Sequence, residues 1–417
     1  MAESVNKSYN KIWLAGIYYI PAVLLYVANV FMPFVRPGVC ATLLMACVLA
    51  ELVLRKQLVF GTFIDRLVIV YILYNALSVI WLLRSGMPFS VYSGEFVVSL
   101  LPMIFYFAGR SCGDKADGFY RNFIIAILIV GIVGIILQIV MPQFYIDYSY
   151  NIGFASKADA ATCRVRMDSV VGSTVLGFLS AASMIASIPF IMKKGSRAFG
   201  IAAMLISAIT VFMSNQRSAM VVAILTVIYF NYLLFFAYGV RKKRDFVIEI
   251  IVIIGGFLLF CIIKQDAALK AYYRLVSLPG AIGQRSEQWI AAINNMYSTW
   301  FGNGLGANGH RALGVENAFV VADGGLVKTY CEQGIFGFSM YIYILILTFK
   351  KGLKDLKSYC APIGIIAAAL LQSIGSNILA FQLAVPVFWF ALGSVYSGED
   401  TGQKDTGKET DMKREEA

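Results

Sequence analysis

The sequence predicts an all-α, polytopic membrane protein, a helix bundle of about 12 transmembrane helices. Of its 417 residues, 59% are hydrophobic and 14% are charged, and the mean hydropathy is +0.73. A soluble domain carries about 25% charged residues, and one water-soluble core cannot hide so much apolar surface. The apolar runs are roughly as long as the ~20 residues that a spanning helix needs. They lack the alternation of a membrane strand, which excludes a barrel.

Each apolar run predicts one helix. The expected ranges are 13–33, 38–54, 64–83, 91–109, 122–141, 169–192, 198–213, 218–238, 246–264, 324–349, 360–379 and 381–397. These spans are nearly free of charge, and the polar residues gather in the loops between them. We therefore expect residues 1–400 to form a single membrane domain. The tail 401–417 is charged and without aromatic residues, so we expect it to be disordered.

The basic residues predict the orientation. They cluster between spans, as in "RKKR" at 241–244 and "KKGLKDLK" at 350–357. The positive-inside rule places these clusters and both termini in the cytoplasm. The net charge of +11 thus reflects membrane orientation, and we expect no nucleic-acid partner. No cleavable signal is evident, so we expect the first helix to be retained.

Two long loops, 142–168 and 264–323, are expected on the outer side. Loops of this length are usually functional or disordered. Within the second, "RSEQWIAAINNMYSTWFG" predicts an amphipathic helix against the membrane surface or the end of the bundle. Its apolar face consists of Trp289, Ala292, Ile293 and Met296. The following "FGNGLGANG" supplies glycines for a turn or a close backbone approach.

Outward-facing arginines indicate an anion-binding site. Arg164 and Arg166 end the first long loop, Arg217 lies in a short turn between two spans, and Arg285 opens the helix of the second loop. A charge near hydrocarbon is costly and usually has a partner or a function. The planar fork of arginine suits phosphate, so converging arginines would clamp a pyrophosphate. The alternative is that these are snorkelling residues or salt-bridge partners.

Acidic residues and one histidine complete the candidate site. Asp323 lies where the second loop meets a span, and Glu287 follows Arg285 by two residues. A carboxylate beside arginines can serve as general base for a sugar hydroxyl. The alternative for Glu287 and Glu332 is a role as salt-bridge partners that hold the arginines in place. His310, the only histidine, is either a base near neutral pH or a solvated loop residue.

Several familiar motifs are missing from the sequence. It contains no phosphate-binding glycine loop, zinc-binding histidine pair or Cys-x-x-Cys, and its outer loops hold no acidic pair for a metal. We therefore expect no metal and no cofactor. If the protein is an enzyme, it therefore needs a substrate whose electrophile is already activated. A lipid-linked diphospho-sugar is such a substrate.

Three motifs in order resemble the O-antigen polymerase and ligase superfamily. They are "SNQRSAM" at 214–220, "GQRSEQW" at 283–289 with the later "WFGNGLGANG", and "ADGGLVKTYCEQGIFGF" at 322–338. "RMDSVVGSTVLGFL" resembles the family's entry into the span after the first long loop. The resemblance covers roughly residues 160–345. Ligases of the family show a His-Asn pair where this chain has Asp323, which favours a Wzy-type polysaccharide polymerase.

The resemblance implies metal-independent, inverting glycosyl transfer on the outer face of the inner membrane. Undecaprenyl-diphosphate-linked oligosaccharides are the implied donor and acceptor, and the product is O-antigen, capsule or exopolysaccharide. Arg217, Arg285 and Asp323 correspond to catalytic positions. The substrate-binding set is Arg164, Arg166, Arg217, Arg285, Glu287 and His310. Other implied partners are the lipid bilayer and a chain-length regulator and flippase of the same pathway.

Two other functions remain open. One is an O-antigen ligase that transfers the glycan to lipid A core. The other is a lipid-linked-sugar flippase or transporter, whose charges should line a cavity at the membrane midplane. Because the predicted spans are nearly free of charge, an enzyme with its chemistry in the outer loops is favoured.

Overall fold

The computed structural model describes residues 13–58, 60–113, 116–154, 166–239, 255 and 278–398. Every regular element within these residues is a helix, which confirms the all-α fold. Three expectations fall outside the described part of the chain: the helix 246–264, apart from Gly255, the side chain of Arg164, and the tail 401–417.

The main helices follow the predicted order. They are α1 (Trp13–Ile17), α2 (Tyr19–Phe31), α3 (Pro37–Leu54), α4 (Phe63–Leu77), α5 (Val79–Arg84), α6 (Phe89–Glu95), α7 (Phe105–Ser111), α8 (Ala116–Val140), α9 (Pro142–Asn151), α11 (Ser173–Met192), α12 (Arg197–Ser214), α13 (Arg217–Tyr232), α16 (Leu278–Asn294), α17 (Gly325–Gly352), α18 (Cys360–Gly375) and α19 (Val385–Ser394). Shorter turns of other helix types join them, among them η1 (Phe96–Leu100), η2 (Leu101–Ile104), η5 (Leu233–Ala237), η6 (His310–Ala312) and η8 (Ile378–Ala380).

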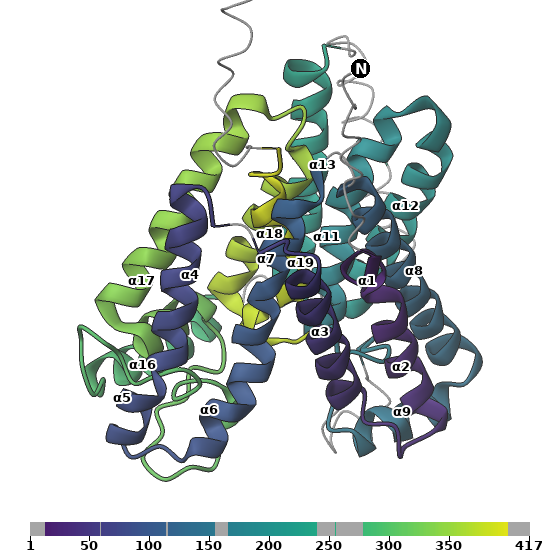
Figure 1. The fold of residues 1–417 in the computed structure, drawn as a ribbon. Helices are drawn as coiled ribbons and strands as arrows, with labels where there is room; N and C mark the ends of the chain where they lie inside the picture. The colour runs from purple at the N-terminus through teal and green to yellow at the C-terminus, as the bar shows by residue number, and fades with distance from the viewer. Residues whose placement is uncertain are drawn as a thin grey trace, which may run out of the picture.

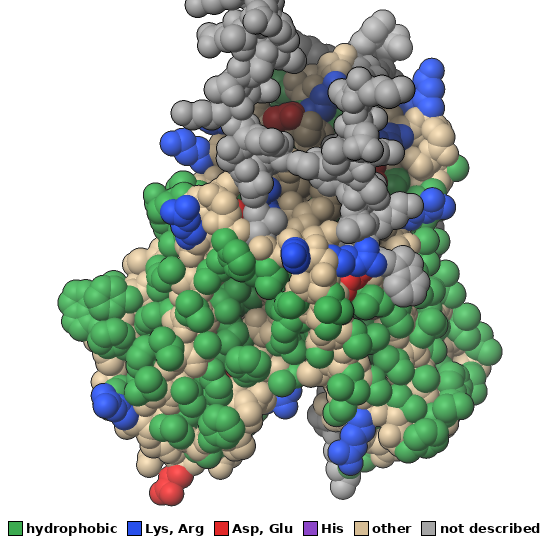
Figure 2. Space-filling model, viewed as in Figure 1, with side chains coloured by type: hydrophobic (Ala, Val, Ile, Leu, Met, Phe, Trp, Pro, Cys, Tyr) green, Lys and Arg blue, Asp and Glu red, His purple; other side chains and the backbone are tan. Residues whose placement is uncertain are grey.

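The bundle has the apolar surface of a polytopic membrane protein. Within the described residues, eight helical stretches are long and apolar enough to cross a membrane, and three shorter apolar helices, α2, α18 and α19, accompany them. Hydrophobic side chains cover the middle of the face in Figure 2, with Lys and Arg side chains above and below. Large side chains such as Leu43 (62% exposed) and Ile139 (67% exposed) contribute to this surface. So broad an exposed apolar belt is rare in soluble proteins.

The helices run up and down between two ends (Figure 1). We call the end with α9, α16 and the start of α17 the loop end. We call the opposite end, where α17 finishes, the tail end. Leu14 contacts Glu51 near the end of α3, and Arg110 contacts Tyr396 near the end of the described chain. The first and last described residues therefore lie together at the tail end.

The centre of the bundle is α11, which packs against α8, α12, α13 and α18. It is the most buried of the long apolar helices, and α18 lies between it and α17 in the packing order. This arrangement places the starts of α11, α13 and α17 at the loop end. The turns that carry the predicted site residues therefore share one end of the molecule.

Several charged residues within or beside the spans are buried and paired. Arg110, at most 4% exposed, pairs at 3.2 Å with Asp65, which is fully buried, and Tyr106 donates to the same carboxylate at 2.7 Å. Thr62 caps α4 through Asp65 as well. A second buried cluster lies near the loop end and is described below. Buried charges need partners because desolvation otherwise opposes the charged form.

The two predicted loops contain more helix than expected. The first begins with α9, and the second contains α16, which starts at Leu278. The expected amphipathic face of α16 is confirmed in part. Ala292 is buried and Trp289 and Met296 pack beside it, whereas Ile293 stays 40% exposed. This face packs against α17 and the chain that precedes it, so α16 is fixed to the end of the bundle.

Candidate functional site

An ion pair at the loop end joins two residues that the sequence predicts for the site. Nη2 of Arg285 in α16 lies 2.8 Å from Oδ2 of Asp323, just before α17. The side chains are 36% and 41% exposed, so both groups can be reached from water. An exposed pair contributes about 0–1 kcal/mol to stability. An anionic ligand can therefore compete with Asp323 for the guanidinium.

Asp323 is held through its backbone as well. The indole N–H of Trp289, one turn beyond Arg285 on α16, donates to the carbonyl oxygen of Asp323 at 2.5 Å. A Cβ atom on Gly324 would lie 2.5 Å from the indole nitrogen, and φ of this residue is +130°. Glycine is therefore required here, which gives the "ADGG" sequence a structural reason. Arg285 and Trp289 together hold Asp323 from the same helix face.

The helix that follows Asp323 is broken. At Gly334, within α17, φ is 61° and ψ is −169°. A Cβ atom at this position would lie 2.5 Å from the carbonyl oxygen of Trp300, so the neighbouring chain occupies the space of a side chain. The chain from Thr299 to Gly304 fills the break. Its backbone bonds are Asn303 N to Cys331 O (2.9 Å), Gly304 N to Glu332 O (2.9 Å), Ile335 N to Thr299 O (2.9 Å) and Phe336 N to Trp300 O (3.2 Å).

These four bonds explain two motifs at once. A broken helix in an apolar bundle is tolerated where other protein groups satisfy its backbone. The glycine-rich "FGNGLGANG" and the two residues before it, Thr299 and Trp300, supply those groups through a close approach, and "EQGIFG" supplies the break. The second loop is thus built into the bundle rather than lying free above it.

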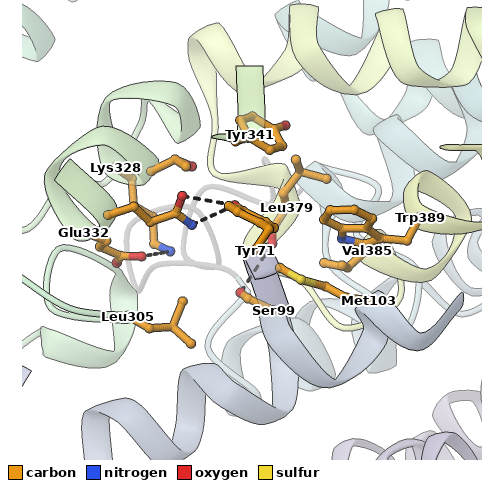
Figure 3. A pocket seen from close by; sticks show the side chains of 12 residues that line it. Tyr71, Ser99, Met103, Leu305, Lys328, Glu332, Tyr341, Leu379, Val385 and Trp389 are labelled. Carbon is orange, nitrogen blue, oxygen red and sulfur yellow. Dashed lines mark hydrogen bonds and ion pairs between the residues drawn. The ribbon is translucent and has the colours of Figure 1, made fainter. Parts of the chain in front are cut away.

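We call the exposed ion pair of Arg285 and Asp323 the surface pair. Three ionisable side chains are buried beneath it. We call Lys328, Glu95 and Glu332 the buried triad. Nζ of Lys328 lies 2.8 Å from Oε1 of Glu95 and 3.0 Å from Oε2 of Glu332, and the three side chains are at most 8% exposed. The hydroxyl of Ser99 donates to Glu95 at 2.6 Å. Figure 3 shows Lys328 and Glu332 facing each other across the first turns of α17.

The depth of the buried triad can be placed along its helices. Lys328 is three residues and Glu332 seven residues beyond the start of α17 at Gly325. At 1.5 Å per residue these positions lie roughly 5 and 10 Å along the helix. Glu95 is six residues into the span that begins at Phe89. The triad therefore lies in the part of its helices nearest the loop end.

A cavity of about 50 Å³ adjoins the triad. Figure 3 shows its lining, which includes Tyr71, Ser99, Met103, Leu305, Tyr341, Leu379, Val385 and Trp389. The hydroxyl of Tyr341 is buried with no hydrogen-bond partner among the described residues. A polar cavity of this size can hold a water molecule, and it is too small for a sugar.

Asn308 fastens the second loop to the triad. Its backbone N–H donates to Oε1 of Glu332 at 3.3 Å, and its side-chain oxygen accepts from Asn303 at 2.9 Å. Its carbonyl oxygen accepts from the N–H of Val321 at 2.9 Å. Val321 is two residues before Asp323. The position of the surface pair therefore depends on the buried groups beneath it.

Arg166 and Arg217 form a second charged region at the loop end. Both side chains are exposed, and neither has an ion-pair partner among the described residues. The N–H of Met167 donates to the carbonyl of Met213 at 3.2 Å, which brings the Arg166 segment beside the turn that holds Arg217. Because α18 packs against both α13 and α17, it separates this region from the surface pair. One clamp of all these arginines stays a prediction.

Two predicted residues lie near the surface pair without joining it. Glu287 is exposed, and Arg285 pairs with Asp323 instead. His310 opens η6, and its ring centroid lies 6.4 Å from that of Phe381. Partial burial, and next the charge of Lys328, lower the pKa of His310 below its usual 6.5. The imidazole is therefore mainly neutral at pH 7 and can accept a proton.

Sequence reasoning missed part of this arrangement. Glu287 has no ion-pair partner among the described residues, and Glu332 pairs with Lys328 rather than with an arginine as predicted. The spacing of four residues between them on one helix is a signal that could have found this pair. Glu95 had no such signal, because 233 residues separate it from Lys328.

The fold and these contacts define a polytopic helical membrane protein with an accessible arginine–carboxylate pair at one end. No protein-family profile matches the chain, and no curated protein is significantly similar to it in sequence.

Proposed function

We propose that this protein is a membrane glycosyltransferase that polymerises undecaprenyl-diphosphate-linked oligosaccharide repeat units into a surface polysaccharide. The observation that carries the proposal is the exposed Arg285–Asp323 pair at the loop end of an apolar bundle. The lipid of such a substrate lies in the bilayer, so its diphosphate lies at the membrane surface. An arginine fork fits that anion, and the neighbouring carboxylate suits a base.

In the proposed reaction, a sugar hydroxyl of the acceptor attacks the anomeric carbon of the donor. The bond from that carbon to the diphosphate oxygen breaks, and undecaprenyl diphosphate leaves with the electron pair. Asp323 accepts the hydroxyl proton and later releases it to water. Arg285, freed from Asp323, stabilises the charge that develops on the diphosphate. Attack from the face opposite the diphosphate inverts the anomeric centre.

Arg166 and Arg217, with Arg164, are proposed as further contacts to the diphosphate or the glycan. Figure 2 shows the lower edge of the molecule notched between two groups of helices, with Lys or Arg side chains beside the notch. A large lipid-linked substrate in this notch would lie beside these basic side chains. Holding two such substrates in line would also accelerate the reaction through proximity.

The proposal places the loop end on the outer face of the inner membrane and both termini in the cytoplasm. Basic clusters support this orientation. The described tail end carries Lys193, Lys194 and Arg197 in one turn and the lysines of 350–357 in another. The positive-inside rule assigns such clusters to the cytoplasm.

A lipid-linked-sugar flippase is the second candidate function. The break in α17 at Gly334 and the buried charges of Lys328 and Glu332 are features that transporters share. However, transporters place such groups near the midplane, whereas this triad lies near the loop end. That position favours chemistry at the membrane surface. A ligase is less favoured because Asp323 stands where ligases place a histidine.

Purified protein in lipid vesicles with lipid-linked repeat units tests the proposal. We expect a ladder of longer lipid-linked glycans and release of one undecaprenyl diphosphate for each new bond. Movement of the labelled substrate between leaflets without chain growth would identify a flippase. Transfer only to added lipid A core would identify a ligase. The absence of all products would overturn the proposal.

A further inference from the structure

A second cavity opens at the loop end, beside α5 and the chain that follows α16. Its volume is about 470 Å³. The lining residues are Ile80, Trp81, Arg84, Tyr297, Ser298 and Phe301. Ligand pockets in proteins usually measure roughly 300–1,000 Å³. Neither this lining nor that of the small cavity includes Arg285 or Arg217, so the cavity is a separate feature of the surface.

Aromatic rings form one wall of this cavity. The ring centroid of Trp81 lies 5.3 Å from that of Phe301 and 5.5 Å from that of Tyr74. Phe301 in turn lies 5.5 Å from Phe336 on α17. Tyr297 is 50% exposed and Phe301 is 43% exposed, so ring surface is available to a ligand. Because the rings support one another, this surface is preorganised.

Polar groups accompany the rings. The indole nitrogen of Trp81 is buried and has no hydrogen-bond partner among the described residues. Arg84, which ends α5, is exposed and has no ion-pair partner in the described part of the chain. The hydroxyl oxygen of Ser298 accepts from the N–H of Phe301 at 3.2 Å. Arg84 and Ser298 therefore offer polar groups beside the apolar faces of the rings.

The lining chemistry selects among occupants. A lipid tail would use the rings and leave the guanidinium of Arg84 without a partner. An inorganic phosphate would use Arg84 and leave the rings of Trp81 and Phe301 without a contact. A sugar ring has C–H faces that stack on aromatic rings and a rim of hydroxyls that accept and donate hydrogen bonds. It uses both parts of the lining.

We propose that this cavity is a carbohydrate subsite that binds a sugar ring of the glycan. The inference depends on the proposed function, which identifies that glycan as the lipid-linked one. The distance between the cavity and the surface pair is one that an oligosaccharide can span. From Arg285 to Asn294 the helix α16 advances nine residues, roughly 14 Å, and Tyr297 follows three residues later. The N–H of Tyr297 donates to Oδ1 of Asn303 at 2.6 Å, which fixes this part of the cavity wall within the second loop.

Equilibrium dialysis with the purified full chain tests the subsite. The probe is the tritium-labelled free oligosaccharide that mild acid releases from the lipid-linked repeat unit, so it carries no diphosphate. We expect saturable binding by the wild-type protein. Phe301→Leu and Arg84→Gln should each raise the Kd about tenfold. The first variant removes an aromatic ring on which the sugar stacks, and the second removes the guanidinium that binds its hydroxyls. Trp300→Leu is the matched control: Trp300 is 56% exposed and adjacent in sequence, but it does not line the cavity.

Tryptophan fluorescence provides a second measurement. The oligosaccharide should change the emission of the wild type and of Trp300→Phe, and Trp81→Phe should lose most of that change while it still binds. Absence of saturable binding by the wild type would overturn the subsite. Equal losses of binding and melting temperature in Phe301→Leu and Trp300→Leu would also overturn it, because the rings would then serve only as a membrane-interface belt.

The outcomes separate the subsite from the proposed function. Oligosaccharide binding that depends on Phe301 and Arg84, in a protein that extends no lipid-linked chain, would support the subsite and contradict the polymerase. Chain growth by a protein whose affinity for the oligosaccharide is the same in wild type, Phe301→Leu and Arg84→Gln would contradict the subsite alone.

Discussion

Arg285 and Asp323 form an ion pair at 2.8 Å although 38 residues separate them in the sequence. The helix of Arg285 is fixed to the chain beside Asp323 by the apolar contacts of Ala292 with Val321 and Cys331. The pair is therefore positioned by packing, and its own energy contributes little to the fold. Removal of either charge should change the chemistry far more than the stability.

We predict that Arg285→Ala reduces chain growth by about 10²–10³-fold in the vesicle assay. The reason is the loss of a preorganised donor aimed at the departing diphosphate. The melting temperature in detergent should change little, since an exposed ion pair contributes about 0–1 kcal/mol. Comparison of polymer ladders from equal amounts of inserted protein measures the effect.

Two variants control this experiment. Arg285→Lys keeps the charge and loses the planar fork, so its activity should lie between those of wild type and Arg285→Ala. Arg66→Ala removes an exposed arginine at the tail end and should leave chain growth unchanged. Normal long-chain polymer from Arg285→Ala would remove Arg285 from the site.

Asp323→Asn should reduce chain growth by about 10²–10⁴-fold if Asp323 is the base, because an amide cannot accept the hydroxyl proton. The bond from Trp289 goes to the backbone carbonyl and survives this change. The local structure should therefore persist, as judged by a melting temperature and an intrinsic fluorescence spectrum that match those of the wild type. A variant with wild-type turnover would assign Asp323 to positioning Arg285 alone.

His310 should give the protein a measurable pH dependence. Partial burial and Lys328 lower its pKa in the folded state, so protonation favours the unfolded chain. The associated stability is present in full above about pH 6.5 and is lost as the pH falls through the folded-state pKa. In the His310→Gln variant, the melting temperature should change less between pH 7 and pH 5 than it does in the wild type. It is the only histidine, which makes the comparison specific.

The same variant also addresses the ligase alternative. We expect His310→Gln to retain chain growth, because Asp323 is the proposed base. If His310→Gln abolished transfer while Asp323→Asn preserved it, histidine-based chemistry would replace the present proposal. A pH profile of stability identical to that of the wild type would show that His310 is solvated in the folded protein.

The sequence predicts the fold because, in a membrane, the length of each apolar run determines where a helix forms. Apolar runs of sufficient length become helices, since each backbone group in lipid must be paired within its own segment. The start of α3 at Pro37 and that of α17 at Gly325 fall within a residue of the expected positions. The helix α9 was not expected, because its tyrosine-rich sequence is neither apolar nor periodic enough to predict it.

The candidate site was predictable only in part. The glycines and the Arg285 motif are local signals, and the structure gives them local reasons. The pairing of Arg285 with Asp323, and of Lys328 with Glu95, depends on which helices become neighbours. That information comes from tertiary packing rather than from spacing along the chain. Buried charges inside apolar runs were underestimated for the same reason, because their partners come from distant helices.

Gly334→Ala should disrupt the second loop. Alanine is strained at φ = +61°, and its Cβ would lie 2.5 Å from the backbone of Trp300 and Gly302. Strain alone costs about 1–3 kcal/mol, and the clash adds to it, so we expect a large fall in melting temperature. Limited proteolysis between residues 295 and 324 should become faster, because the loop loses its backbone partners.

Gly118→Ala is the matched control for that experiment. Gly118 lies in α8, and no atom lies within 4 Å of a Cβ built there. Alanine should be neutral or slightly stabilising in a helix. If Gly334→Ala melted at the same temperature as Gly118→Ala, the break in α17 would not be a fixed feature of the fold.

Lys328→Met should be strongly destabilising, because it leaves the carboxylates of Glu95 and Glu332 buried without a cation. Removal of one partner from a buried pair typically costs 3–5 kcal/mol. The triple variant Lys328→Met, Glu95→Gln, Glu332→Gln should recover much of that loss, since no uncompensated charge remains. Lys350→Met, at the exposed far end of the same helix, should leave the melting temperature nearly unchanged.

Because Asn308 links Glu332 to the segment before Asp323, we also expect Lys328→Met to lower chain growth in the fraction that stays folded. Equal melting temperatures for Lys328→Met and Lys350→Met would contradict a buried charge cluster beneath the surface pair.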